Sequence, residues 1–328
     1  MLLKVDHLFK SFDQGKVHAA FDTSLQLKAG KTYSFLGESG SGKTTLARLI
    51  AGLERPDRGQ IYLNDELISS ESYHLPAEKR AIGFLFQHYA LFPHLTIAQN
   101  IEYGISSVPN RKETVEAMLR LVDLEGYGNR YPHEVSGGQQ QRVALVRALA
   151  PKPRLILLDE PFSSLDNNLR HELRTEVFAI LQNTGVCSVF ITHNSADAMA
   201  ISDEILVFKD GKLLQQATPE TLYEQPSSPY IARFFDTLVE MPDALLVSFG
   251  YRSAAKKLYF LRNHHFKFNE TGDFSAIASL VRVSRVGKNY LVEAKVDDHV
   301  FNFSCPEKPN ESSFKIGWMD KDLLVFNG

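Results

Sequence analysis

The chain has 328 residues, a net charge of −3 and 44% hydrophobic residues, a composition that suits ordinary packed cores and suggests about two domains. Both signs of charge are interspersed, so the basic patch of a nucleic-acid-binding protein is not expected, and two cysteines, Cys187 and Cys305, are too few and too far apart for a disulfide framework or a zinc site. No run of about 18 apolar residues predicts a membrane span, so a membrane role is expected only through a partner.

The first part of the chain predicts alternating strands and helices. The start, MLLKVDHLFKSF, carries early charges and does not read as a signal peptide. The run TYSFL, residues 32–36, is a short strand that leads into a glycine-rich loop, and a helix is expected from about Lys43 to Ala51. The other expected elements are strands over 2–9, 21–28, 61–65 and 82–86, a mainly helical stretch over 96–149, a buried parallel strand over 154–160, a helix over 165–184, a strand over 188–192, a helix over 195–201 and a strand over 204–215.

The pattern changes between about residues 224 and 242, where YEQPSSPYIARFFD predicts a linker with a short helix. An all-β module of about 85 residues follows, which is typical of a small barrel. Within it, His264 and His265 are adjacent and suggest a metal site or a pair of solvent-exposed side chains. Because adjacent strand residues face opposite ways, the exposed pair is favoured. The strands expected in this module cover 257–262, 277–283, 289–296, 299–305 and 322–326.

The stretch GESGSGKT, residues 37–44, matches the pattern G-x-x-x-x-G-K-[ST] between a predicted strand and a predicted helix, which is the context that supports this motif. Glycines let backbone N–H groups approach phosphate oxygens, and the N-terminus of a helix favours negative charge. In such a loop Lys43 can reach the β- and γ-phosphates, and the hydroxyl of Thr44 can bind Mg²⁺. The loop therefore predicts a site for a nucleoside triphosphate and Mg²⁺.

Two adjacent carboxylates end the apolar run LILLDE, residues 155–160. A magnesium–triphosphate site needs a second oxygen ligand and a group that polarises the attacking water. Asp159 fits the Mg²⁺ shell, and Glu160 fits a general base. A DE pair after a strand is also a common helix-start signal, but the phosphate loop favours the catalytic interpretation.

Two more polar residues follow predicted strands. Gln87 comes after IGFLF, and His193 comes after SVFIT. Ligands bind at the carboxyl ends of strands in open α/β sheets, so His193 is expected to donate to a γ-phosphate oxygen and Gln87 to contact Mg²⁺ or the attacking water. Taken singly, each is also an ordinary polar residue at a strand end.

A second anion-binding feature is VSGGQQQR, residues 135–142. Ser136 as an N-cap, followed by two glycines, exposes backbone N–H groups at the start of a helix. Gln140 and Gln141 are interpreted as solvated helix residues.

Six motifs in this order and spacing resemble the ATP-binding subunits of ABC transporters: Gly37–Thr44, Gln87, VSGGQ, LILLDEP, SSLD (163–166) and ITHN (191–194). The resemblance covers about residues 2–235. It implies an α/β fold of the P-loop NTPase class, in which residues 1–235 form an ABC cassette with a RecA-like core and a helical subdomain at about 96–150. A small all-β, OB-like regulatory domain of the TOBE type is implied for residues 241–328.

The resemblance also implies the roles of site residues. Glu160 would be the catalytic base, His193 the γ-phosphate switch, and Thr44, Gln87 and Asp159 would hold the Mg²⁺ region. Phe12 would stack on adenine, although it also suits a core aromatic beside the first strands. ATP would be bound by Gly37, Glu38, Ser39, Gly40, Ser41, Gly42, Lys43, Thr44 and Thr45 of one chain and, because two cassettes of this family pack head to tail, by Ser136, Gly137, Gly138 and Gln139 of the other, with Asp166 at the dimer interface.

Two further stretches resemble importer ATPases. The segment HYALFPHLTIAQNI, residues 88–101, resembles the part that binds a membrane subunit, with the contact near Phe92; without the resemblance it is a hydrophobic turn before a helix. The β module resembles the regulatory domain of importer ATPases for maltose, polyamines, sulfate and ferric iron, although LRNHHF departs from the usual Arg-Pro-Glu after Arg262. RYPHEVSGGQQQR is most similar to the ferric-iron branch.

The expected protein is thus the ATP-hydrolysing subunit of an importer, possessing ATP and Mg²⁺ sites at a homodimer interface. Its expected partners are two transmembrane permease subunits and, indirectly, an extracytoplasmic solute-binding protein, with no nucleic acid. It is expected to be peripheral, on the cytoplasmic side of the inner membrane. The solute is expected to be ferric iron, with polyamine, sulfate or sugar as alternatives. A soluble ABC ATPase with a regulatory or assembly role and no transport is the other interpretation.

Overall fold

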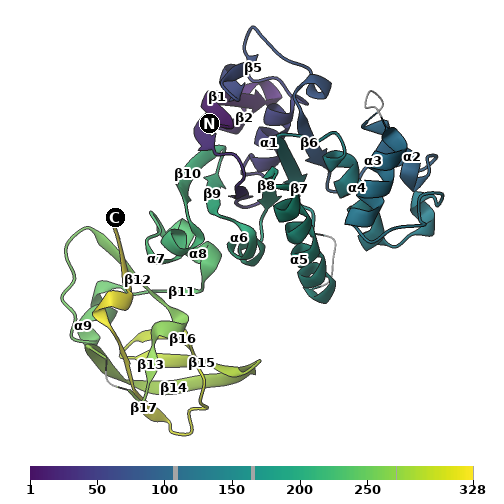
Figure 1. Ribbon diagram of the computed structural model, residues 1–328. Coiled ribbons are helices and arrows are strands. Elements are labelled where there is room, and N and C mark those ends of the chain that lie inside the picture. The colour runs from purple at the N-terminus through teal and green to yellow at the C-terminus, as the bar shows by residue number, and fades with distance from the viewer. Residues whose placement is uncertain (106–109, 164–166, 271, 328) are drawn as a thin grey trace. The chain divides into compact units, whose positions relative to one another are not determined.

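The computed structural model describes residues 1–105, 110–163, 167–270 and 272–327, in two compact units, Met1–Thr221 and Leu222–Gly328 (Figure 1). The strands of the first unit are β1 (Leu3–Phe12), β2 (Val17–Leu27), β3 (Thr32–Leu36), β4 (Arg58–Leu63), β5 (Glu66–Ser70), β6 (Ile82–Leu85), β7 (Leu155–Asp159), β8 (Cys187–Thr192), β9 (Glu204–Lys209) and β10 (Lys212–Ala217). Its helices are α1 (Lys43–Ala51), α2 (Ile97–Tyr103), α3 (Arg111–Leu121), α4 (Gly137–Leu149), α5 (Asn167–Thr184) and α6 (Ser195–Ile201), and α7 (Pro219–Glu224) crosses the boundary between the units.

Two sheets organise the first unit. The larger has the strand order β10-β9-β3-β8-β7-β6, in which β10 is antiparallel to β9 and the other five strands are parallel. The smaller sheet is antiparallel, with the order β2-β1-β4-β5. Because parallel strands end at one edge of a sheet, the residues that follow β3, β7 and β8 are brought together.

Strand β7 explains why its sequence is continuously apolar. Leu155 and Leu157 belong to the core shared with β1, β3 and α1, whereas Ile156 and Leu158 belong to the core shared with α2, α4 and α5. Alternate side chains of a strand point to opposite faces, and both faces of the sheet are covered at its parallel strand β7. The strand is therefore fixed from both sides, which holds Asp159 at its end.

The helical stretch expected over 96–149 forms three helices, and Figure 1 shows α2, α3 and α4 gathered at one end of the unit. Helices α2 and α4 begin in the same way. Thr96 and Ser136 are N-caps, each accepting from the backbone N–H of the glutamine three residues later, Gln99 or Gln139, whose side chain accepts in return. This reciprocal capping satisfies two backbone donors and fixes where each helix starts.

The prediction of a single strand over 204–215 is wrong, because two strands, β9 and β10, form a hairpin there. Strands β9 and β10 pair antiparallel, and the turn between them is Asp210–Gly211, with φ values of 49° and 76°. An Asp-Gly pair with both φ positive is the favoured two-residue hairpin turn, and its twist matches that of the strands.

The second unit is mainly β. Its elements are α8 (Pro229–Phe235), β11 (Leu238–Glu240), α9 (Asp243–Ser248), β12 (Lys257–Arg262), β13 (Lys267–Phe268), β14 (Phe274–Val286), β15 (Asn289–Val296), β16 (His299–Cys305), β17 (Ser313–Trp318) and β18 (Leu323–Asn327). They form antiparallel sheets in the orders β11-β12-β18 and β13-β17-β14-β15-β16 around fully buried Trp318. The prediction of an α/β P-loop cassette followed by a small β domain is confirmed.

The segment expected as a linker packs within the second unit. Ala232 of α8 lies in a cluster with Phe260 and Phe326, and the Arg233 guanidinium lies 5.6 Å from the centre of the Phe260 ring. The predicted domain limits, 1–235 and 241–328, stay a prediction that assigns this segment to the cassette.

The two adjacent histidines do not lie on a strand. His264 and His265 are in a 3-10 turn, Asn263–His265, and their ring centroids are 4.3 Å apart. The reasoning from opposite strand faces was therefore wrong at this position. Among the described residues no group of three or more His, Cys, Asp or Glu side chains is arranged to hold a metal ion.

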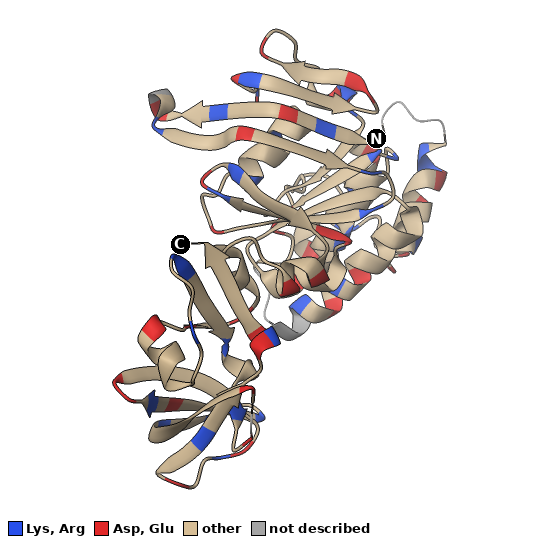
Figure 2. Cartoon of the chain, turned by 90° about the vertical axis from the view of Figure 1, so that its left-hand side faces the viewer, with Lys and Arg blue, Asp and Glu red and all other residues tan. Residues whose placement is uncertain are grey.

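Two general features concern the surface and the helices. Figure 2 shows Lys and Arg interspersed with Asp and Glu over the strands and helices of each unit. In the part of the chain that the structure describes, every helix is too short or too polar to cross a bilayer.

Candidate functional site

The phosphate loop joins β3 to α1, as its sequence predicts. Gly42 is the N-cap of α1 and has a φ of 96°, which L-residues rarely adopt. A Cβ at Gly42 would also lie 2.0 Å from the carbonyl oxygen of Ala19, and a Cβ at Gly37 would lie 2.4 Å from that of Phe208. These glycines therefore let the loop run directly against β2 and β9, with the N–H groups of the first turn of α1 left open for an anion.

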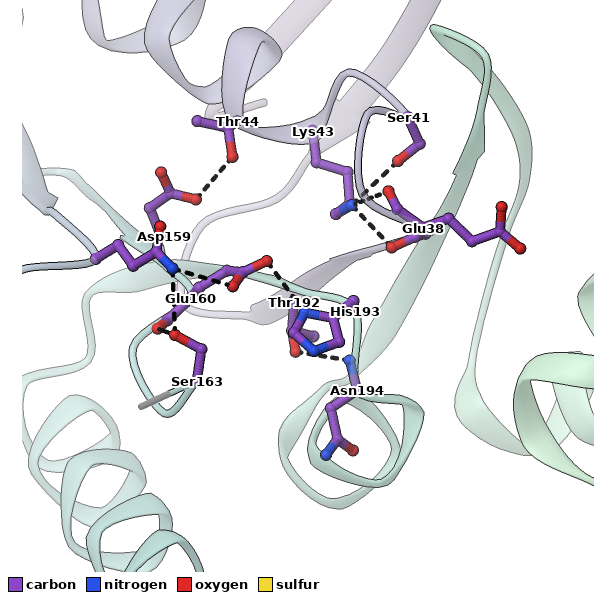
Figure 3. A network of polar contacts seen from close by, with 12 residues as sticks. Glu38, Ser41, Lys43, Thr44, Asp159, Glu160, Ser163, Thr192, His193 and Asn194 are labelled. Atoms are coloured by element: carbon purple, nitrogen blue, oxygen red, sulfur yellow. Dashed lines mark hydrogen bonds and ion pairs between the residues drawn. The ribbon is translucent and has the colours of Figure 1, made fainter. Parts of the chain in front are cut away.

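Lys43 lies across this loop. Its Nζ donates to the carbonyls of Gly37 at 2.8 Å and Glu38 at 2.7 Å and to the hydroxyl of Ser41 at 3.1 Å. Figure 3 shows Lys43 with Glu38 and Ser41. The side chain is buried, and burial lowers the pKa of Lys43, while the carboxylate of Glu160 acts in the opposite direction. A cation held by carbonyl oxygens close to open N–H groups suits the phosphates of a nucleotide.

Asp159 and Thr44 meet between β7 and α1. The Thr44 hydroxyl donates to Asp159 Oδ1 at 2.9 Å (Figure 3). Burial raises the pKa of Asp159, whereas the hydrogen bond from Thr44 opposes that rise. A hydroxyl and a carboxylate side by side, both offering oxygen atoms, fit the ligand preference of Mg²⁺.

Glu160 turns away from Asp159 into a different set of contacts. Its φ is 45°, a left-handed value that is uncommon outside glycine, and its N–H donates to the carbonyl of Ile191 on β8 at 2.9 Å. This turn at the end of β7 directs the two carboxylates to different partners. His193 Nδ1 lies 3.1 Å from Glu160 Oε1, as Figure 3 shows.

Gln87 reaches the same carboxylate from β6. Its Nε2 donates to Glu160 Oε2 and to Ser163 Oγ, both at 3.5 Å. The Ser163 hydroxyl in turn donates to the carbonyl of Glu160 at 3.0 Å. The structure thus brings Gln87, Glu160 and His193 together, and it adds Ser163, which the sequence offered only as the start of SSLD.

A depression of about 290 Å³ lies over the phosphate loop. Phe12 borders it and is 38% exposed, so it is not the core aromatic that was the alternative interpretation. Sequence reasoning missed Val17 and Ala19, because β2 begins at Val17 and not at residue 21. The full lining is Phe12, Val17, Ala19, Ser39, Gly40, Gly42, Lys43, Thr44, Thr45 and Glu160.

The SGGQ residues are absent from that lining, although all four are described. Ser136 is exposed and caps α4, with Gln139 N–H donating to its Oγ at 3.3 Å. The interpretation of Gln140 and Gln141 as solvated is wrong. Gln140 donates to the carbonyl of Pro132 at 2.9 Å, and Gln141 is fully buried and accepts from the Tyr89 hydroxyl at 3.3 Å. Asp166 lies outside the described residues.

The segment after Gln87 is held by α2 and α4. Tyr89 and Ala90 have left-handed φ values of 59° and 46°, and their carbonyls accept from the Arg147 guanidinium at 2.8 and 2.7 Å. Asn100, which is fully buried, accepts from the N–H of Phe92 at 2.8 Å and donates to its carbonyl at 3.1 Å. The loop therefore has one defined shape, because its backbone groups are paired with side chains of two helices.

Comparison with known proteins agrees with this geometry. The sequence profile described as ABC transporter matches residues 21–163. The sulfate/thiosulfate import ATP-binding protein CysA of Synechocystis sp. is 42% identical over 311 residues, 91% of this chain and 86% of that protein. The Fe(3+) ions import ATP-binding protein FbpC 2 of Haemophilus influenzae is 42% identical over 249 residues, 75% of this chain and 69% of that protein.

Solved structures give the same family. The dimeric, post-hydrolysis structure of the ATP-binding cassette MJ0796 bound to ADP and Pi is 30% identical, with a TM-score of 0.59 over 66% of this chain and 99% of that chain. CbiO1 from Clostridium perfringens, part of the ABC transporter complex cbiONQ, is 25% identical, with a TM-score of 0.61 over 68% of this chain and 91% of that chain. From the motifs, the site and these relatives, the chain belongs to the import ATP-binding proteins of the ABC transporter family, which hydrolyse ATP to drive transport.

Proposed function

We propose that this chain is the nucleotide-binding subunit of an ABC importer and that it hydrolyses two ATP molecules at the interface of a homodimer. The observation that carries the proposal is the convergence of Lys43, Thr44–Asp159 and Glu160–His193 at the carboxyl ends of β3, β7 and β8. This single edge of the sheet offers a phosphate cradle, a pair of oxygen ligands and a base with an orienting partner.

In this proposal the glycine-rich loop and Lys43 bind the phosphates, and Phe12 stacks on the adenine. Glu160 accepts a proton from the water whose oxygen attacks the terminal phosphorus, while the bond to the bridging oxygen breaks and ADP leaves. His193 Nδ1 orients Glu160, which leaves Nε2 to contact the terminal phosphate. Gln87 donates to the other carboxylate oxygen of Glu160 and contacts the attacking water.

Thr44, Asp159 and Gln87 would hold Mg²⁺. When bound, the ion would neutralise charge that develops on the phosphate oxygens. The Thr44–Asp159 hydrogen bond supports this assignment because it already places two oxygen donors side by side.

The exposed N-cap of α4 supports a dimer. Ser136, Gly137, Gly138 and Gln139 do not border the depression over their own chain's phosphate loop, so we propose that they contact ATP bound to the partner subunit. ATP would then favour the closed dimer and hydrolysis would remove that bias, which is a population shift between two states.

We place the contact with two transmembrane permease subunits near Phe92, on the loop that Asn100 and Arg147 hold. The chain would then be peripheral on the cytoplasmic side of the inner membrane, with a solute-binding protein as an indirect partner. The solute we propose to test first is sulfate or thiosulfate, because the CysA relative matches 91% of this chain, whereas the FbpC 2 relative matches 75%. Ferric iron is the rival solute.

The first test is Glu160→Gln, with exposed Glu172→Gln on α5 as the matched control. The glutamine keeps the size of the side chain but cannot take a proton, so hydrolysis should fall at least 100-fold while ATP binding persists. A dimer trapped with ATP should appear in size-exclusion chromatography. Wild-type turnover in Glu160→Gln would exclude Glu160 as the base.

The second test asks whether the site is shared between chains. Ser136→Ala and Lys43→Ala should each be inactive alone, and mixing them should restore one competent site in each heterodimer. Thr96→Ala is the matched control, because it removes the same kind of capping box from α2. A heterodimer that forms without recovered activity would contradict the shared site.

A further inference from the structure

A buried arginine caps the far end of the phosphate-loop helix. Arg80 is 1% exposed, and its Nη1 donates to the carbonyls of Leu49 at 2.8 Å and Ile50 at 2.9 Å in the last turn of α1. Carbonyls in the last turn of a helix lack partners within the helix and form the negative end of its dipole. The opposite end of α1 begins with Lys43. Arg80 therefore fixes the helix that carries the phosphate loop.

Among the described residues, no carboxylate forms an ion pair with the guanidinium of Arg80. The Arg80 Nε donates to the carbonyl of Leu75 at 2.7 Å. Burial lowers the pKa of Arg80 to about 10, so the side chain is still a cation at neutral pH. The positive charge of Arg80 is stabilised by the dipoles of the carbonyl groups to which it donates, and this stabilisation depends on close contact. Gly52 allows that contact, because a Cβ there would lie 2.4 Å from Arg80 Nε.

His74 completes the pairing of the guanidinium. Its Nδ1 lies 3.2 Å from Arg80 Nη2 and 3.2 Å from the Ser69 hydroxyl, and its Nε2 lies 3.2 Å from the carbonyl of Gly52. Because arginine has only donors, Nδ1 must accept, which leaves the proton on Nε2 to be donated to Gly52. Only neutral His74 satisfies both neighbours.

Among the described residues, the charged groups that shift the pKa of His74 are both cations, Arg80 and Arg55. Arg80 follows η2 (Ala77–Lys79), and Arg55 follows α1; Ser69 of β5 contributes a neutral hydroxyl. Burial lowers the pKa of His74, and Arg80 and then Arg55 add to that shift, against the hydrogen bond to Gly52. A proton on Nδ1 would face the Arg80 N–H and would lose this hydrogen bond.

Arg80 also lies close in sequence to β6, the strand that leads to Gln87. It lies two residues before β6, whose other end leads to Gln87. One guanidinium thus holds the end of α1 close to the start of β6. A shift of the guanidinium would move the phosphate loop and Gln87 relative to each other.

We propose that Arg80 and neutral His74 are positioning residues for phosphate binding: Arg80 fixes α1 from its C-terminal end, and protonation of His74 releases Arg80 and weakens ATP binding. The inference rests on the proposed phosphate-binding role of Lys43 and the glycine-rich loop.

The test measures the dissociation constant for ATP and the steady-state kcat and KM of the full-length chain between about pH 5.5 and 8.5. Wild type should lose affinity as the pH falls below about 6.5, the ordinary pKa of histidine. His74→Asn supplies an acceptor that does not titrate, so most of this loss should disappear. The terminal phosphate of ATP also titrates in this range, but it does so equally in every variant. His299→Asn, in the second unit, is the matched control.

Arg80→Lys keeps the charge but cannot span the two carbonyls and His74, so we expect about a tenfold higher dissociation constant for ATP and a smaller change in kcat. Exposed Arg120→Lys on α3 is its control and should behave as wild type. Thermal unfolding without nucleotide separates loss of fold from loss of positioning.

Identical pH profiles for wild type and His74→Asn would overturn the inference, whatever the stability of the Arg80 variant. An unchanged ATP affinity in folded Arg80→Lys would overturn it as well. Lys43→Ala separates the two levels. If Lys43→Ala binds ATP normally, the proposed function fails; if it does not bind ATP but His74 and Arg80 variants behave as wild type, only this inference fails.

Discussion

Asn100→Ala should destabilise the first unit and release the loop that we assign to the permease contact. The Asn100 side chain accepts from the N–H of Phe92 at 2.8 Å and shares its two amide hydrogens among the carbonyls of Phe92, Leu95 and Thr96 at 3.1, 3.1 and 3.0 Å. One accepted bond and one bond for each of the two amide hydrogens make three hydrogen bonds, and at about 1 kcal/mol each their loss is about 3 kcal/mol. Because the site is fully buried, water cannot replace these bonds.

The assay is thermal unfolding of the nucleotide-free chain. A loss of about 3 kcal/mol corresponds to a fall of roughly 6–12 °C in Tm for a unit of this size. Asn302→Ala, an exposed strand residue of the second unit, is the matched control and should change stability by less than about 0.5 kcal/mol. A fall in Tm of under about 2 °C would refute the reasoning, since it would mean that the loop keeps its shape without the Asn100 amide.

Two other predictions concern the phosphate loop and the buried thiol. Gly42→Ala should abolish ATP binding, because its Cβ would lie 2.0 Å from the Ala19 carbonyl at a φ of 96°; normal binding in isothermal titration would contradict this. Burial raises the pKa of Cys187 to about 12, so the native thiol should resist iodoacetamide at pH 8 and react once the chain unfolds. Because the folded-state pKa is the higher one, this thiol should reduce stability only as the pH rises above about 9. Rapid alkylation of the native chain would contradict the burial of Cys187.

Much of the site was predictable because its residues follow strands in a fixed order. The runs TYSFL, LILLDE and SVFIT each predict a buried strand, and parallel strands align the residues that come after them. This principle accounts for the meeting of Lys43, Glu160 and His193. It does not predict that Glu160 takes a left-handed φ, which separates its carboxylate from that of Asp159.

Other features were hidden because local sequence does not specify long-range partners. Gln141 looks like a solvated helix residue, yet it is fully buried and accepts from the Tyr89 hydroxyl at 3.3 Å. Arg80 looks like a surface residue in AEKR, yet it caps a helix about thirty positions earlier in the chain. The role of Asn100 could not be predicted from local sequence either, because it depends on a loop that folds back on α2.

The sequence by itself determined the cassette, its phosphate loop and the SGGQ helix start, because each motif is local and its chemistry follows from residue type and spacing. The tertiary structure decided that Gln87 and His193 both contact the carboxylate of Glu160, and that buried Arg80 donates to carbonyls of α1. It also decided that the SGGQ residues do not border the depression over their own chain's phosphate loop. Those outcomes depend on packing between segments far apart in the chain, where the cost of burying an unpaired polar group selects the partner.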